Sequence, residues 1–193
     1  MLDDALERYP LMQVLDDGTA CTIRPLERGD EEQFVTFFTA VPEIERLFIK
    51  QRIGSGRFRK AWCRDLDYDS ALVLLAIAHD RCIGTIVLQQ REGGWKRHIG
   101  RVHSATHPEY RDVGVSLMLV NELIDIAKHC GLTRLESEFN GERSAAIRCF
   151  ETAGFREMLR MPGYLKSMSG DRHDWVLLGM NLMPSADCLG AGD

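Results

Sequence analysis

The sequence predicts a mixed α/β (α+β) domain, built on one mixed sheet that carries helices on both faces. Apolar runs of strand length recur along the chain between turn residues, as in ALVLLAIAH at residues 71–79. Amphipathic helix patterns interrupt these runs, and short glycine-containing dipeptides separate neighbouring strands. Strands and helices that alternate in this way within one chain are typical of a sheet covered on both sides.

The first half of the chain is expected to form a hairpin, two helices and a second hairpin, over residues 11–26, 27–41, 44–64 and 71–92. Asp17-Gly18 is a strong turn signal for the first hairpin. Asp30 is a candidate N-cap for the first helix, whose phenylalanines recur at helical spacing. Gly54-Ser55-Gly56 breaks the second helical region, and His79-Asp80 forms the tight turn of the second hairpin.

The second half is expected to add a strand, a helix, a strand, a helix and two strands. Gly93-Gly94 is interpreted as a hairpin turn that leads into a strand at residues 97–107. Gly131 and Gly154 follow the two helix patterns as C′ residues. The other strands include residues 133–139 and 172–183.

The length of the chain suits one domain with an appended element. We expect residues 1–18 to be an N-terminal extension that contributes the first hairpin strand. Residues 19–184 would form the single domain, and residues 185–193 a disordered tail.

Composition and charge are those of a soluble cytoplasmic protein. The 193 residues carry a formal net charge of −5, and no apolar run approaches the roughly 20 residues that span a bilayer. Neither nucleic acid nor a membrane is therefore expected as a partner. The acidic N-terminus MLDDALERYP is unlike a signal peptide. The six cysteines are scattered without metal-ligand spacing, which predicts reduced thiols and no metal site.

The stretch THPEYRDVGVSLMLV joins a short turn to the start of a long amphipathic helix. A helix N-terminus exposes backbone N–H groups and about half a positive charge. Gly114 lets the backbone approach a ligand closely, and Ser116 keeps bulk away from the same point. The turn therefore predicts an anion cradle, with a glycine that only eases the connection as an equal alternative. It lacks the glycine patterns of Walker A loops and of dinucleotide-binding folds.

The turn Arg111-Asp112-Val113-Gly114-Val115-Ser116 resembles the Arg/Gln-x-x-Gly-x-Gly/Ala turn of the GNAT superfamily of acyl-CoA-dependent N-acetyltransferases. AAIRCFETAGF, at residues 145–155, resembles a later helix of that family, and CTIRPLERGDEEQF resembles its first strand and helix. The resemblance covers residues 19–183 and implies a mostly antiparallel sheet of about seven strands. The N-terminal hairpin is also similar to the start of bacterial members that acetylate protein lysines.

The resemblance implies that acetyl-CoA is the cofactor and that an amine of a small molecule or a protein lysine is the acceptor. The turn from Arg111 to Ser116 would hold the CoA pyrophosphate through backbone N–H groups. The strand 97–107 would splay from its neighbour beyond position 133. In that gap, pantetheine would pair with the backbone near Ala105, Thr106 and His107, and a backbone N–H would polarise the thioester. Edge strands would also permit a homodimer.

The acceptor amine must lose a proton to attack, so a general base or a water chain is required. Members of the family often carry a glutamate on the strand before the turn, where this chain has no acid. That strand offers His98 and His103, and His98 lies about where the family's base often lies. Glu138, on the strand after the helix, is a third candidate. For each of the three, a purely structural role is the alternative.

Three positions depart from the family's pattern. Phe150 stands where members often have a tyrosine that protonates the departing thiolate, and where the side chain would border the cofactor. Arg143 replaces a frequent asparagine and could pair with a CoA phosphate. Asp112 puts an acid near the phosphates, so its side chain is expected to point outward. The loss of the tyrosine keeps open a second reading, a non-catalytic acyl-CoA-binding regulatory module, and a third is an interaction domain without cofactor.

Seven basic residues lie between Ile44 and Arg64. In the fold that the resemblance implies, this region flanks the acceptor site, where a basic rim would suit an acidic acceptor. A solvated helix face explains the same pattern.

Overall fold

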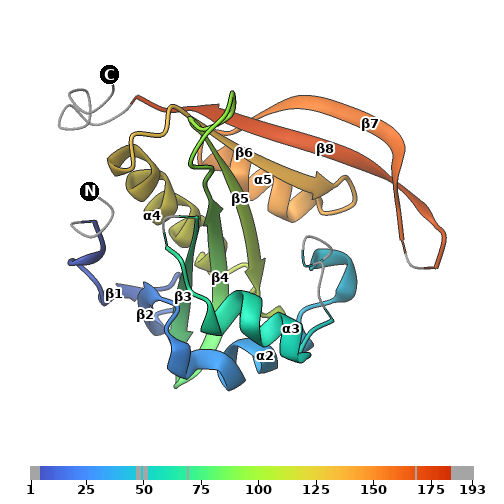
Figure 1. Ribbon diagram of the computed structural model, residues 1–193. Coiled ribbons are helices and arrows are strands. Elements are labelled where there is room, and N and C mark those ends of the chain that lie inside the picture. Colours follow the sequence, from blue (N-terminus) through green and yellow to red (C-terminus); the bar gives the residue numbers. More distant parts are fainter. Residues whose placement is uncertain (1–4, 47–48, 50–51, 69, 168, 184–193) are drawn as a thin grey trace.

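The computed structural model describes residues 5–46, 49, 52–68, 70–167 and 169–183. They form an eight-stranded sheet with the order β1-β2-β3-β4-β5-β6-β8-β7 (Figure 1). Neighbouring strands are antiparallel except β5 and β6, which are parallel. The predicted mixed, mostly antiparallel sheet is therefore confirmed, with one strand more than the seven expected. The tail expected at residues 185–193 lies outside the described residues.

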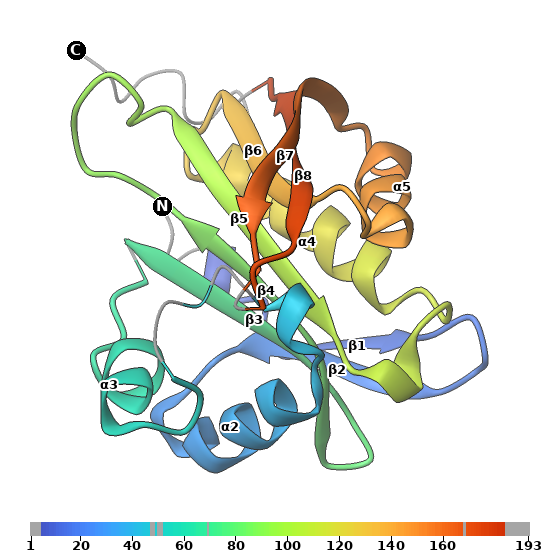
Figure 2. The same ribbon diagram turned by 90° about the vertical axis from the view of Figure 1, so that its right-hand side faces the viewer.

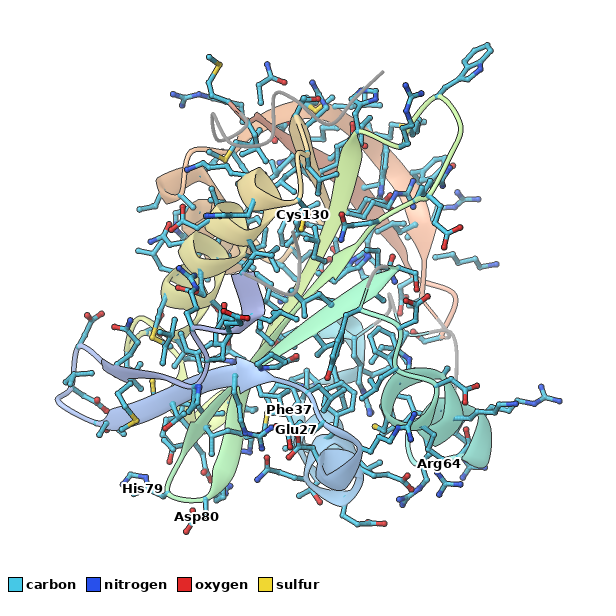
Figure 3. All side chains as sticks on the ribbon, turned by 60° about the vertical axis from the view of Figure 1, so that its left-hand side comes forward. Glu27, Phe37, Arg64, His79, Asp80 and Cys130 are labelled. Atoms are coloured by element: carbon cyan, nitrogen blue, oxygen red, sulfur yellow. The ribbon has the colours of Figure 1, made fainter. Side chains whose placement is uncertain are left out.

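Both N-proximal hairpins occupy their predicted positions. Their strands are β1 (Leu11–Val14), β2 (Ala20–Pro25), β3 (Ala71–Ala78) and β4 (Arg81–Gln89). Gly18 takes a left-handed φ of 85° in the first turn. His79 and Asp80 lie at the tip of the β3–β4 hairpin (Figure 3), where both also have positive φ. The turn residues thus adopt the backbone that the sequence signals require.

The helix α2 (Glu31–Ala40) follows a short 3-10 turn, η1 (Arg28–Asp30). Asp30 precedes α2 as predicted, but its side chain makes no capping hydrogen bond to that helix. Instead its carboxylate accepts two hydrogen bonds from Arg24, each at 2.6 Å, and one from the Glu27 backbone at 2.8 Å. Asp30 therefore ties the end of β2 to η1.

The helical region expected over residues 44–64 is mostly absent from its described part, but the break predicted at Gly54-Ser55-Gly56 is confirmed. The structure has short pieces instead: η2 (Glu43–Glu45), α3 (Gly56–Arg59) and the π-helical turn η3 (Lys60–Arg64). Gly54 has a φ of 75°, which a continuing helix cannot accommodate. Ser55 then caps α3 by accepting the Phe58 N–H at 3.2 Å.

The second half of the chain follows the predicted order. Its elements are β5 (Ile99–Thr106), η4 (Pro108–Tyr110), α4 (Val115–His129), β6 (Arg134–Asn140), α5 (Ser144–Thr152), β7 (Arg156–Lys166) and β8 (Arg172–Asn181). The tight turn predicted at Gly93-Gly94 is wrong, because a loop over residues 90–98 joins β4 to β5. No helix within the described ranges is long and apolar enough to cross a membrane.

Helices cover both faces of the sheet, as Figure 2 shows. On one face, α4 packs through Leu119, Leu123 and Ala127 against the inner strands, and α5 adds Ile147 and Phe150. On the other face, α2 and α3 contribute a cluster of stacked and edge-on phenylalanines: Phe34, Phe37, Phe38 and Phe58. These two cores hold the central strands rigidly, so the ends of β5 and β6 are fixed in position.

The parallel pairing of β5 with β6 is short. It runs only from Ile99 opposite Arg134 to Val102 opposite Ser137. β5 continues to Thr106 and β6 to Asn140 beyond this point, each still paired with its other neighbour. The two strands therefore separate after Val102 and Ser137, as the splay predicted for this pair requires.

Candidate functional site

The turn before α4 has the geometry of an anion cradle. Gly114 is the N-cap of α4 in the left-handed conformation, with φ 88°, and Asp112 also has a positive φ of 61°. The Gly114 carbonyl accepts the Met118 N–H at 3.0 Å, which starts the helix. The N–H groups of the first helical turn have no partner within α4 and carry its positive dipole end.

Side-chain and backbone contacts hold this turn in place. The hydroxyls of Thr106 and Ser116 lie 2.6 Å apart, which fastens the end of β5 to the first turn of α4. The carbonyl of Val113 accepts the backbone N–H of Asp16 at 3.2 Å, from the loop of the N-terminal hairpin. Val113 and the buried Val115 pack on the core beneath, whereas Arg111 and Asp112 are exposed. The predicted N-terminal extension therefore supports the turn directly.

An open groove of about 590 Å³ runs along this turn. It is lined by the end of β5, the turn, the first residues of α4 and α5, and η2. The lining residues are Glu45, Thr106, Tyr110, Arg111, Asp112, Gly114, Val115, Ser116, Leu117, Glu142, Arg143, Ser144, Ala145, Ala146 and Cys149. The groove thus brings together six of the predicted cofactor-binding residues from the β5 end and the turn, together with Arg143 from the α5 end.

One carboxylate holds two arginines in the groove. Arg111 Nη2 lies 2.6 Å from Glu45 Oε1, and Arg143 Nη2 lies 3.6 Å from Glu45 Oε2. The guanidinium of Arg143 also lies over the Phe139 ring, 5.9 Å from its centroid. Burial lowers the pKa of Arg143, and the Glu45 charge opposes this shift. Asp112 and Glu142 also line the groove, so its binding capacity for a phosphate depends on these two arginines, which the phosphate could take over from Glu45.

Backbone groups of β5 face the gap between the splayed strands. The His107 N–H donates to the Ile83 carbonyl at 2.8 Å. Hydrogen-bonded pairs alternate along an antiparallel ladder, so Ala105, opposite Thr85, also turns its N–H toward β4. Ser104 and Thr106 therefore point theirs toward the gap. Of the three residues predicted near pantetheine, only Thr106 offers its backbone there, and Ser104 was missed.

Glu138 lies at the start of the gap, on the face of the sheet opposite α4. Arg101 Nη1 lies 3.6 Å from Glu138 Oε1, and the Trp175 indole N–H donates to Glu138 Oε2 at 3.3 Å. His103 is two residues beyond Arg101 on the same face of β5. Burial lowers the pKa of His103 to about 4, with Arg101 acting in the same direction and Glu138 against it. His103 is therefore neutral at physiological pH.

His98 is separated from these groups. It is exposed in the loop before β5, and its carbonyl accepts the Thr133 N–H at 3.1 Å. Seven residues separate the start of β5 from Thr106, which at about 3.3 Å per residue is roughly 23 Å. The structure thus groups Glu138 and His103 at the gap and leaves His98 at the paired end of the strands, away from the turn.

Phe150 does not border the groove. Its ring is fully buried and packs edge-on against Phe139 and Phe155, with centroids 5.0 Å apart in both pairs. Its neighbour Cys149 lines the groove instead. The prediction that the Phe150 side chain touches the cofactor is therefore wrong, because α5 turns this position into the aromatic core. Asp112 is exposed at the rim of the groove.

The cysteines and acids give no sign of other chemistry. The described cysteines, which exclude Cys188, form no disulfide: Cys21, Cys63, Cys82, Cys130 and Cys149. In the part of the chain that the structure describes, no three His, Cys, Asp or Glu side chains gather closely enough to hold a metal ion.

Comparisons with known proteins identify the family of this chain. Residues 37–155, more than half of the chain, match the model of the Acetyltransferase (GNAT) family. An uncharacterized N-acetyltransferase of Methanocaldococcus jannaschii is 24% identical over 169 residues, which cover 84% of this chain and 70% of that protein.

Solved structures share the fold. The GNAT domain of PAT from S. lividans has a TM-score of 0.73 at 20% identity, covering 90% of this chain and 97% of that one. YncA from Salmonella typhimurium, solved with its cofactor acetyl-CoA, has a TM-score of 0.70 at 19% identity, covering 86% and 98%.

Proposed function

Since the chain belongs to the Acetyltransferase (GNAT) family, whose members use acetyl-CoA, we propose that it transfers an acetyl group to a primary amine of a small molecule or protein. The observation that carries this proposal is the placement of the splayed β5 and β6. The glycine turn of α4 lies at the end of β5, and the Glu138 carboxylate lies where the two strands part.

The groove fits the phosphates of CoA. The left-handed Gly114 and the small Ser116 leave the N–H groups at the start of α4 open to an anion, as helix N-termini bind phosphate elsewhere. Arg111 and Arg143 add two cations. Without a phosphate group, both are paired with Glu45. The N–H groups of Ser104 and Thr106 would hold an extended amide chain in the gap by adding a strand-like partner.

Acetyl-CoA would supply the acetyl group as a thioester, so that a C–N bond to the acceptor forms as the C–S bond breaks, and CoA leaves as a thiolate that takes a proton from solvent. The backbone N–H groups that face the gap would stabilise the charge that develops on the carbonyl oxygen. The ammonium group of the acceptor loses two protons in all: the one removed before attack we assign to Glu138, directly or through one water molecule, and the second passes to solvent as the amide forms. Arg101 and Trp175 hold this carboxylate in position.

His103 serves this mechanism less well as the base. Burial keeps His103 neutral, so unlike the Glu138 carboxylate it offers no negative charge to attract the ammonium group of the acceptor. His98 is distant from the gap, so its replacement by alanine should leave the rate and its pH profile unchanged.

The test combines calorimetry with an assay of CoA release. Acetyl-CoA should bind the native chain, and Gly114→Glu should abolish binding, because a side chain at this left-handed position collides with Asp16, distorts the turn and adds a second carboxylate beside it. Glu138→Gln should keep acetyl-CoA affinity and lower turnover by about 10²-fold or more, the usual contribution of a general base. Full turnover by Glu138→Gln would remove it as the base.

Phe150 favours a second candidate function, a regulatory module that binds acyl-CoA without turnover. A tyrosine hydroxyl is missing where members of the family often carry one. Acetyl-CoA binding without CoA release across a broad panel of amines would support this module against the enzyme.

A further inference from the structure

A second hollow lies on the same sheet face as Glu138. It has a volume of about 410 Å³ and opens at the paired end of β5 and β6. The polar and charged side chains that line it include Gln89, Arg91, Lys96, Arg101 and Glu136. Three cations therefore meet one carboxylate, although the whole chain has a net charge of −5.

The positive charge in this hollow is largely uncompensated. Glu136 already accepts a hydrogen bond from Arg134, outside the hollow, at 3.1 Å. Among the described residues, the side chains of Arg91 and Lys96 have no ion pair or hydrogen bond. Arg101 has only the 3.6 Å contact with Glu138 within the same described set. A pocket with open cations and amide groups is suited to a carboxylate.

The basic rim predicted from residues 44–64 is a weaker candidate for this role. Arg59 lies 2.7 Å from Glu31 and contacts Glu32, and Arg64 lies 2.7 Å from Glu31. Lys60 lies 3.8 Å from Asp65. These three cations are neutralised within their own surface network. Arg52 and Arg57 are exposed without an ion pair among the described residues, but they line neither the groove nor the second hollow.

The hollow adjoins the proposed general base. Arg101 lines it and contacts Glu138. Glu136 lines it as well and lies two residues before Glu138 on the same face of β6, which corresponds to roughly 7 Å. An amine placed at Glu138 could therefore extend along the sheet so that a group several bonds away reaches Arg91, Lys96 and Arg101.

We propose that this hollow is the acceptor's anion subsite, and that the preferred acceptors are small primary amines that carry a carboxylate several bonds from the nitrogen. The proposal rests on the proposed acetyl transfer. It adds a substrate class that the acetyl-CoA groove does not determine, since the groove and the hollow lie on different faces of the splayed strands.

The test uses acceptor pairs that differ only in the carboxylate. δ-Aminovalerate is compared with pentylamine, and γ-aminobutyrate with butylamine, in the CoA-release assay. The native chain should have a kcat/KM at least about tenfold higher for the acid of each pair, as expected for one charge-assisted contact. Lys96→Gln should remove most of this preference, and it does not touch Glu138. Arg97→Gln, an exposed neighbour outside the hollow, should keep the preference.

Direct binding separates this proposal from the proposed function. Calorimetry with δ-aminovalerate and the CoA-saturated chain should detect binding that Lys96→Gln and Arg101→Gln weaken, while acetyl-CoA affinity stays unchanged. Acetyl-CoA binding and amine turnover without a preference for the acids would overturn the subsite alone. If acetyl-CoA does not bind, the proposed function is overturned. The subsite is then supported if δ-aminovalerate still binds to the chain, and overturned if it does not.

Discussion

The turn at Gly114 can be tested by adding a single methyl group. The φ of 88° at this position is disfavoured for any residue with a Cβ, at a cost of about 1–2 kcal/mol for alanine. A Cβ here would also lie 2.9 Å from Asp16 Oδ2, so the exposed Asp16 side chain must move. Gly114→Ala should therefore destabilise the chain modestly and distort the turn that it caps.

Gly94→Ala is a matched control. Gly94 has a similar φ of 84°, lies in the loop before β5, and a Cβ there meets nothing within 4 Å. Both variants should lose about 1–2 kcal/mol of unfolding free energy in urea titrations. Only Gly114→Ala should weaken acetyl-CoA binding. If the turn relaxes to relieve this strain and must return to its native shape to bind, the same 1–2 kcal/mol lowers the acetyl-CoA affinity roughly 5- to 30-fold.

Calorimetry with acetyl-CoA, run beside the urea titrations, measures both quantities on the same samples. Equal loss of affinity in the two variants would show that general destabilisation explains the effect. Native affinity in Gly114→Ala, with the expected loss of stability, would refute the role of this backbone as the phosphate cradle.

Three further predictions concern buried or paired groups. Glu45→Gln should lower the unfolding free energy by about 1 kcal/mol yet tighten acetyl-CoA binding severalfold, since the phosphates no longer compete with Glu45 for Arg111 and Arg143; weaker binding in calorimetry would contradict this. His103 has a folded pKa of about 4 against 6.5 unfolded, so its stabilisation is full above pH 6.5 and lost as pH falls to 4. In urea titrations, the unfolding free energy of the native chain should fall by about 3 kcal/mol more between pH 7 and pH 4 than that of His103→Asn. An equal fall in both would show that His103 does not cause this pH dependence. Phe150→Tyr should cost about 1–3 kcal/mol by burying a hydroxyl among aromatic rings, without a gain in CoA release; faster release would place the hydroxyl at the gap.

Features encoded locally were predictable from the sequence. The turn of the first hairpin depends on Asp17-Gly18, and the cradle depends on Gly114 directly before an apolar stripe. In each case the residues that decide the backbone are adjacent in the chain, so no tertiary information is needed. The resemblance to the family then supplied the pairing of distant strands, which periodicity alone does not contain.

The alternating direction of the backbone N–H groups along β5 shows where reasoning from local sequence fails. A one-residue change of register exchanges the groups that face the gap for those that face β4. Ala105 and His107 were therefore predicted at the gap beside Thr106, whereas Ser104 and Thr106 are the residues that face it. The sequence of β5 alone does not set this register. It depends on the pairing with β4, and β4 is in turn paired with β3 through a bulge between Ala76 and Ile77.

Glu45 could not be found from the sequence for a similar reason. It lies 66 residues before Arg111 and 98 before Arg143, in a region that was expected to be a helix. The structure has the short turn η2 there instead, and its Glu45 lines the groove. Conversely, Arg59 and Arg64 suggested a basic rim because their partners Glu31 and Glu32 lie in another helical segment.

The choice between enzyme and binding module depends on Glu138 more than on Phe150. The thiol of CoA has a pKa of about 8.5, only about one unit above pH 7.5. Departure as an unprotonated thiolate therefore costs only about 1.4 kcal/mol. An acceptor with a pKa of about 10.4 is only roughly 0.1% neutral at that pH, a deficit of about 4 kcal/mol. The proton on the amine is therefore the larger obstacle. Glu138, the proposed base, is positioned by Arg101 and Trp175 and would remove the larger obstacle, so the missing tyrosine does not by itself argue against turnover.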